Sequence, residues 1–194
     1  MKAKELYRAL ETDLKPWLTT RGFKKRRVSR LTFQRLVDGK YHSVWFQCDS
    51  HGWDAYAGGE FFVNFTVSES PDPEAGARRD ERLNFFLTDI ELARARHYRD
   101  EVVERIPKPP HSYFVTLQSQ FSKTVGAESA ASLVTTVRDQ FAPAAIPYRR
   151  NQDFRLRYWQ PEDVAGWAAM IIPVLARALE DMESWSLPPY GAKS

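Results

Sequence analysis

An Asp-Gly turn between two alternating segments constrains the fold of this chain more than any other feature. Asp38-Gly39 follows the apolar positions Leu31 and Phe33 and precedes residues 41–49, which alternate as well. Asp-Gly tolerates the positive φ angles of a type I′ turn, so the pattern predicts a β-hairpin. Residues 61–67 repeat the same two-residue period. Together the three segments predict an antiparallel meander.

Helices are predicted on both sides of this meander in the sequence. Residues 4–20 have leucines at three- and four-residue spacing, and Gly22 follows as a C-terminal stop. Thr88 and Glu91 form a capping box for a helix that should run to about residue 105. Pro161 opens a long amphipathic helix near the end of the chain. A shorter helix is expected over 129–140.

Further strands are expected at 83–87, 112–118 and 154–159, and residues 68–80 are expected to form an exposed loop. The predicted fold class is α+β, with a curved, mainly antiparallel sheet packed by N-terminal and C-terminal amphipathic helices. The middle helix, which is the one predicted from Thr88 to about residue 105, either covers the other face of the sheet or leaves it open.

Length and composition favour a single domain over residues 1–194. Of the 194 residues, 43% are hydrophobic, enough to build a core without disulfides. Cys48 is the single cysteine, which excludes an intrachain disulfide and favours a reducing compartment. The first ten residues do not resemble a secretory signal, and no apolar stretch is long enough to span a bilayer. The expected location is the cytoplasm.

Several short motifs follow one another in a distinctive order: DLKPWLTTRGFKKR at 13–26, TFQR at 32–35, VWFQ at 44–47, FFVNF at 61–65, LNFFLT at 83–88 and PKPP at 107–110. This order resembles an uncharacterised bacterial family, the domain of unknown function four-three-zero-four. The resemblance covers most of the chain but implies no catalytic residues. Small bacterial domains of this kind include proteins that neutralise a cognate toxin, which is an analogy at the level of fold and size.

No catalytic, metal or cofactor signature is present in the sequence. The four histidines are scattered, and Cys48 falls on the inward side of its predicted strand. Nucleophile-elbow, Walker and dinucleotide motifs are absent. We therefore predict no catalytic residue, no metal ligand and no cofactor. A small-ligand or enzyme pocket near His51, Asp54 and Glu60 stays open as an alternative.

The outward positions of the predicted sheet carry the main candidate binding residues. If the odd positions of 61–67 face the core, the even positions and the matching positions of the other strands face away. Aromatic and arginine side chains at such positions are typical of interface hot spots. The candidate residues are Trp45, Phe62, Asn64, Arg155, Arg157 and Trp159. If the middle helix covers this face, they are ordinary core residues.

A basic run provides a second candidate surface. Lys24, Lys25, Arg26 and Arg27 lie in a window, residues 14–37, that has no acidic residue. They can contact phosphates, or they can mark a solvated edge strand. The net charge of +3 argues against a dedicated nucleic-acid binder. We therefore predict a non-enzymatic binding protein with a protein partner, such as the immunity protein of a bacterial toxin, and a nucleic-acid-binding module is the alternative.

Overall fold

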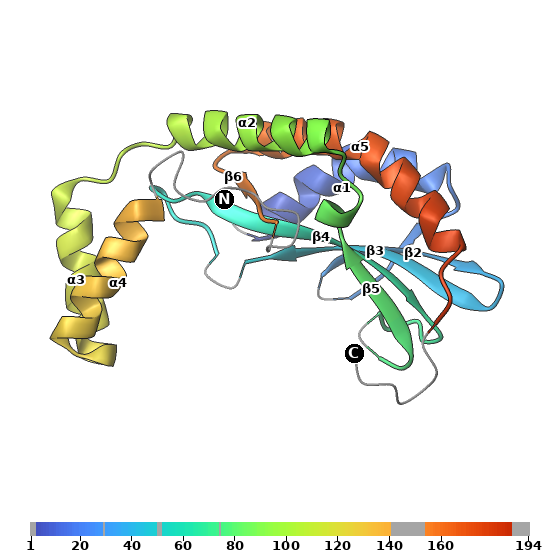
Figure 1. Cartoon of the computed structure of the whole chain (residues 1–194), viewed down its shortest axis with the longest axis horizontal. Coiled ribbons are helices and arrows are strands. Elements are labelled where there is room, and N and C mark those ends of the chain that lie inside the picture. Colours follow the sequence, from blue (N-terminus) through green and yellow to red (C-terminus); the bar gives the residue numbers. More distant parts are fainter. Residues whose placement is uncertain (1–2, 29, 50–51, 74, 141–153, 188–194) are drawn as a thin grey trace.

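The computed structural model describes residues 3–28, 30–49, 52–73, 75–140 and 154–187. This part of the chain forms a six-stranded antiparallel sheet with the order β1-β2-β3-β4-β5, in which β6 also pairs with β4. The strands are β1 Lys24–Lys25, β2 Leu31–Val37, β3 Lys40–Cys48, β4 Gly59–Ser68, β5 Arg78–Arg82 and β6 Leu156–Tyr158. The α+β class with terminal helices is confirmed (Figure 1).

The predicted hairpin sets the register of the sheet. Val37 pairs with Lys40, and both turn residues have positive φ angles, 49° at Asp38 and 78° at Gly39. This is the geometry of a type I′ turn, which matches the twist of the strands it joins. The register continues into β4, where Trp45 lies opposite Asn64. Because side chains alternate, this one pairing fixes which residues share a face.

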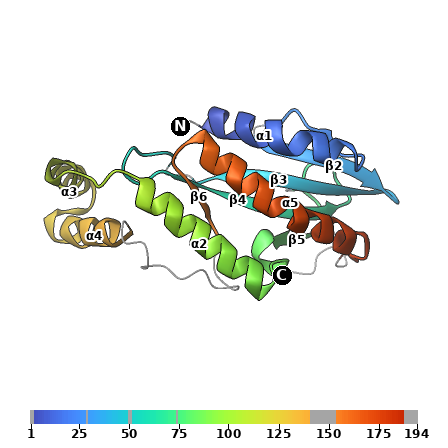
Figure 2. The same cartoon turned by 90° about the horizontal axis from the view of Figure 1, so that it is seen from above.

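Three helices cover one face of the sheet. They are α1 Ala3–Thr19, α2 Asp89–Arg105 and α5 Pro161–Glu183, and α2 runs beside α5 (Figures 1 and 2). Between them and the sheet lies a core that includes Phe33, Phe46 and Phe65 from the strands. The leucines of α1 and Trp167 of α5 complete it.

Both predicted helix starts are observed. The Thr88 hydroxyl accepts a hydrogen bond from the Glu91 backbone amide, and the Glu91 carboxylate accepts one from the Thr88 amide. At α5, Pro161 occupies the first turn, and Asp163 accepts from the Gln160 amide. These caps satisfy amides that a helix cannot satisfy internally.

Two predicted strands are wrong. Leu83–Phe85 is a short 3-10 helix, η1, and the strand lies just before it as β5, which begins inside the predicted loop at 68–80 and extends past its end. Residues 112–118 belong to a helix, α3 His111–Val125. Phe114, Leu117 and Phe121 recur there at helical spacing, a period that a seven-residue window does not reveal. Pro110 precedes the helix as its N-cap residue.

The helix α3 and the predicted short helix, α4 Ala127–Gln140, form a hairpin that we call the arm. The arm projects from one end of the molecule toward the side of the sheet that the other helices do not cover (Figure 1). Within the described residues, none of the helices has the length and apolar character that crossing a membrane requires.

Candidate functional site

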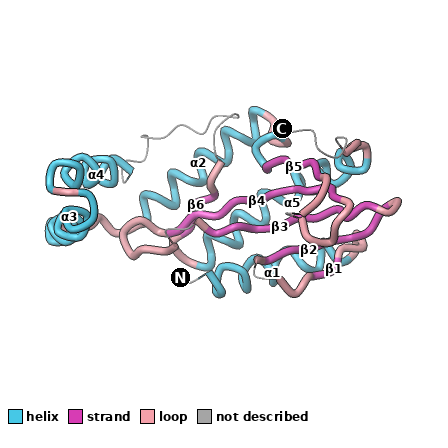
Figure 3. The backbone as a smooth tube through the Cα atoms, turned by 90° about the horizontal axis from the view of Figure 1, so that it is seen from below, coloured by secondary structure: helices cyan, strands magenta, loops and turns pink. Residues whose placement is uncertain are grey.

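The face of the sheet opposite the three helices is the candidate site, and we call it the open face. Figure 3 views the sheet from this side, and none of α1, α2 and α5 passes in front of the strands. The helix α2 lies with α1 and α5 on the other side, so it does not cover the outward residues. The loop after β4 reaches this face where the Pro71 carbonyl accepts a hydrogen bond of 2.9 Å from Gln34.

Arginine side chains lie over the aromatic rings of the open face. The guanidinium carbon of Arg30 is 5.0 Å from the centre of the Trp45 ring. Those of Arg82 and Arg155 are 4.9 and 5.5 Å from the Phe62 ring. Contacts of this kind each contribute about 0.5–2 kcal/mol, depending on exposure. They cover Phe62, which is only 8% exposed, and they hold cationic groups in place on this face.

Hydrogen bonds fix the neighbouring side chains. The Trp45 indole donates to the Thr66 hydroxyl over 2.9 Å, and that hydroxyl donates to Asp80 over 2.7 Å. Arg78 binds the other oxygen of Asp80, also over 2.7 Å. Asn64 is 6% exposed, and its side-chain nitrogen is buried without a hydrogen-bond partner. The open face is therefore rigid, with an unused donor at its centre.

Two of the predicted binding arginines are engaged within the protein. Arg157 lies opposite Glu60 in the register and binds it over 2.7 Å. Arg155 contacts Glu60 at 3.3 Å and Asp49 at 3.1 Å. Both arginines belong to the open face, as the alternation predicts. The two carboxylates, Asp49 and Glu60, offset their charges.

Trp159 lies apart from the other aromatic residues of the site. It follows β6, and its indole donates to the Ala55 carbonyl over 3.2 Å. Trp53 in turn donates to the Trp159 carbonyl over 3.0 Å. Asp54 accepts hydrogen bonds from the amides of Tyr56 and Ala57, which shapes the same loop. Trp159 thus anchors a loop beside the sheet.

The two described residues of the alternative pocket, Asp54 and Glu60, are engaged by neighbouring groups. Asp54 is used within its own loop, and Glu60 binds the two arginines. The third residue, His51, lies outside the described residues. Across the described residues, no group of three or more potential metal ligands comes together.

The basic run is divided between the two sides of the sheet. Lys25 is paired with Phe33 on the helix side, where it forms an ion pair with Glu11 of α1. This hydrogen bond, opposed by burial, lowers the pKa of Glu11 below its usual value. Lys24 is paired with Gln34 and therefore belongs to the open side. Arg26 and Arg27 follow β1 as exposed side chains.

Cys48 and His42, two groups suited to nucleophilic or acid-base chemistry, have pKa values shifted by burial. Cys48 packs at the margin of the core, as its position in the strand predicts, and burial raises the pKa of its thiol. A thiol that stays protonated is a weak nucleophile. Burial, followed by the nearby Arg35, lowers the pKa of His42. His42 is only 3% exposed, which keeps it from a substrate.

Sequence reasoning missed two residues of the open face. Arg82 lies on β5, between the predicted loop at 68–80 and the predicted strand at 83–87, although Arg78, Asp80 and Arg82 alternate in the sequence. Arg30 belongs to the acid-free window, but the sequence does not show that it folds over Trp45. Charged residues at every second position are typical of edge strands, so this pattern could have identified Arg82 in the sequence.

Comparisons of the chain with protein-family models, with curated proteins and with solved structures give no match. The ligand of the open face therefore has to be inferred from the chemistry of the face itself. That chemistry comprises aromatic rings under arginines, a fixed hydrogen-bond network, and a buried amide donor.

Proposed function

We propose that the protein is a non-enzymatic binding protein whose open face docks on a protein partner in the cytoplasm. The observation that carries this proposal is the stacking of Arg30 on Trp45 and of Arg82 on Phe62, on a face free of covering helices. Tryptophan and arginine are the residue types most enriched at interface hot spots. Side chains already held in place lose little entropy when a partner binds.

The charges of the open face favour an acidic partner surface. Arg78 binds Asp80, and Arg30 and Arg82 lie over the rings of Trp45 and Phe62. Arg155 and Arg157 are matched by Asp49 and Glu60. The five arginines named on this face outnumber its three named carboxylates, Asp49, Glu60 and Asp80, and this excess would steer an acidic surface toward it.

A bacterial toxin is the partner that we propose, with the protein acting as its immunity protein. The mechanism is occlusion, because a sheet face that covers an active site or substrate groove stops activity without any chemistry of its own. The resemblance to the domain of unknown function four-three-zero-four stays a prediction. The proposal that the open face binds the partner does not depend on this resemblance.

The first prediction concerns Arg30 and Arg82. The double variant Arg30→Glu and Arg82→Glu should weaken binding by at least about 100-fold, because it removes both stacked cations and repels an acidic surface. The partner would be captured from source-cell lysate with the full-length chain as bait, then purified and titrated by calorimetry. A partner encoded beside this gene that arrests growth, and that coexpression neutralises, would identify the toxin.

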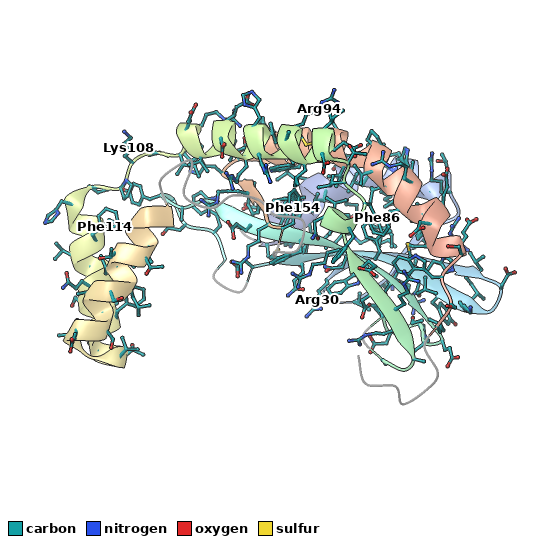
Figure 4. The ribbon with its side chains drawn as sticks, in the orientation of Figure 1. Arg30, Phe86, Arg94, Lys108, Phe114 and Phe154 are labelled. Carbon is teal, nitrogen blue, oxygen red and sulfur yellow. The ribbon has the colours of Figure 1, made fainter. Side chains whose placement is uncertain are left out.

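Arg94→Glu is the matched control, because Arg94 lies on α2 at the opposite side of the molecule from Arg30 (Figure 4). It should bind as the wild type does. Circular dichroism would verify that all variants are folded. Equal affinity of the double variant and the wild type would exclude the open face as the docking site.

A nucleic-acid partner is the second candidate, favoured by the place of Lys24 on the open side of β1, in the same acid-free window as Arg30. On this alternative, the wild type should retard single-stranded RNA or DNA in a gel at about 50 mM salt, with affinity falling steeply as salt increases. Lys24→Glu should then weaken the shift. Absence of any shift at low salt would exclude this function and leave the protein partner.

A further inference from the structure

The arm is attached to the rest of the protein chiefly at its base. Tyr113 packs edge-on against Tyr56 of the 52–58 loop, with ring centres 5.0 Å apart. Burial, together with the nearby Asp54, raises the pKa of Tyr113 to about 12. The hydroxyl therefore stays protonated and donates a hydrogen bond to Asp54. Beyond this anchor, the two helices extend away from the sheet (Figures 1 and 2).

The arm leaves much of its apolar surface in solvent. The helix α3 has no fully buried residue, and in α4 only Ala130 and Val134 are buried among the described side chains. Val115, Val125 and Leu133 are 53%, 46% and 40% exposed. Helices of this length are marginal in water unless a face is packed. A pair of such helices can therefore gain stability by packing its exposed apolar side chains against another surface.

The charges of the arm indicate what kind of partner covers it. Among its described side chains, only Lys123 and Glu128 carry a full charge at neutral pH, and they flank the turn at Gly126. A strongly charged partner would find little to pair with among these described side chains. A second copy of the arm would bring no row of repelling charges against these side chains. With the two tips together, Lys123 of each copy would face Glu128 of the other.

We propose that the arm pairs with the arm of a second copy, giving a two-fold symmetric dimer held by four packed helices. Such an interface is self-complementary by symmetry. Helices of this length extend ~22 Å, and two side by side are ~20 Å wide, so one face offers on the order of 400 Å² per copy. That is roughly half of the ~800 Å² per partner in a standard interface. The dimer should therefore dissociate in the micromolar range.

Sedimentation velocity of the full-length chain over about 1–200 μM tests this proposal. The wild type should shift from monomer to dimer as its concentration rises. Leu133→Glu, which puts a charge into the apolar contact, should raise the dissociation constant at least tenfold. Ile90→Glu is the control, since Ile90 is 69% exposed on α2, and it should dimerise normally. A wild type that stays monomeric throughout, or a dimer that Leu133→Glu leaves unchanged, would overturn the proposal.

A charge exchange tests the pairing of the tips. Lys123→Glu and Glu128→Lys should each dimerise severalfold more weakly alone, because the tips then carry like charges. An equimolar mixture should recover the wild-type affinity through mixed dimers. Equal affinities of the separate variants and the mixture would overturn the two-fold arrangement. Because this experiment uses no other partner, its result is independent of what the open face binds.

Discussion

Trp167→Ala is expected to lower the free energy of unfolding by about 4 kcal/mol, because it removes the largest fully buried side chain of the core. The Trp167 ring meets Tyr98 of α2 edge-on, with centres 4.7 Å apart. Its indole donates to the Arg157 carbonyl of β6 over 2.6 Å. The substitution therefore opens a cavity and leaves a buried carbonyl without its partner.

Urea unfolding followed by far-UV circular dichroism would measure this loss. Trp167→Phe should cost about half as much, because it keeps most of the ring and loses the hydrogen bond. Trp53→Ala is the control for a tryptophan at the surface, since Trp53 is 36% exposed, and it should cost about 1 kcal/mol. Similar losses at positions 53 and 167 would contradict the packing described for α5.

The fold was largely predictable because its main signals are local. The Asp-Gly turn fixed the β2–β3 hairpin, and the leucine spacing and caps located α1, α2 and α5. The arm was only partly predictable, because α3 packs mainly on α4 and the helical spacing of its apolar residues extends beyond the window that was interpreted as a strand. The strand β5 was missed because its residues are all charged, and its extended form depends on pairing with β4.

The sequence predicted which residues share the candidate face, but it did not predict whether helices cover that face. The two-residue alternation correctly places Trp45, Phe62 and Asn64 on one side of the sheet. Which side the helices cover depends on contacts between elements distant in the sequence, and the pattern left that question open. The same holds for Glu60, whose ion pairs with Arg155 and Arg157 require β6 to return beside β4. Whether these residues bind a partner stays a prediction.

Asp163 is the other position at which we expect a large effect, because one buried carboxylate joins three elements. It is 1% exposed, and one of its oxygens binds Arg105 of α2 over 2.6 Å. The other oxygen accepts from the amides of Trp159 and Gln160, over 2.8 and 2.9 Å. The same side chain thus caps α5, ends β6 and ties both to α2.

Asp163→Ala should therefore cost about 3 kcal/mol, combining a lost helix cap of about 1–2 kcal/mol with a lost charge-assisted hydrogen bond of about 1.5–3 kcal/mol. Asp163→Asn should cost less, because one oxygen can still accept from the two amides. Glu162→Ala, at the exposed neighbouring position, should change stability by less than about 0.5 kcal/mol. Urea unfolding of the three variants would test this order. If Asp163→Asn lowers the free energy of unfolding as much as Asp163→Ala does, the ion pair with Arg105 dominates. If both variants lose less than about 1 kcal/mol, Asp163 does not hold α2, α5 and the end of β6 together.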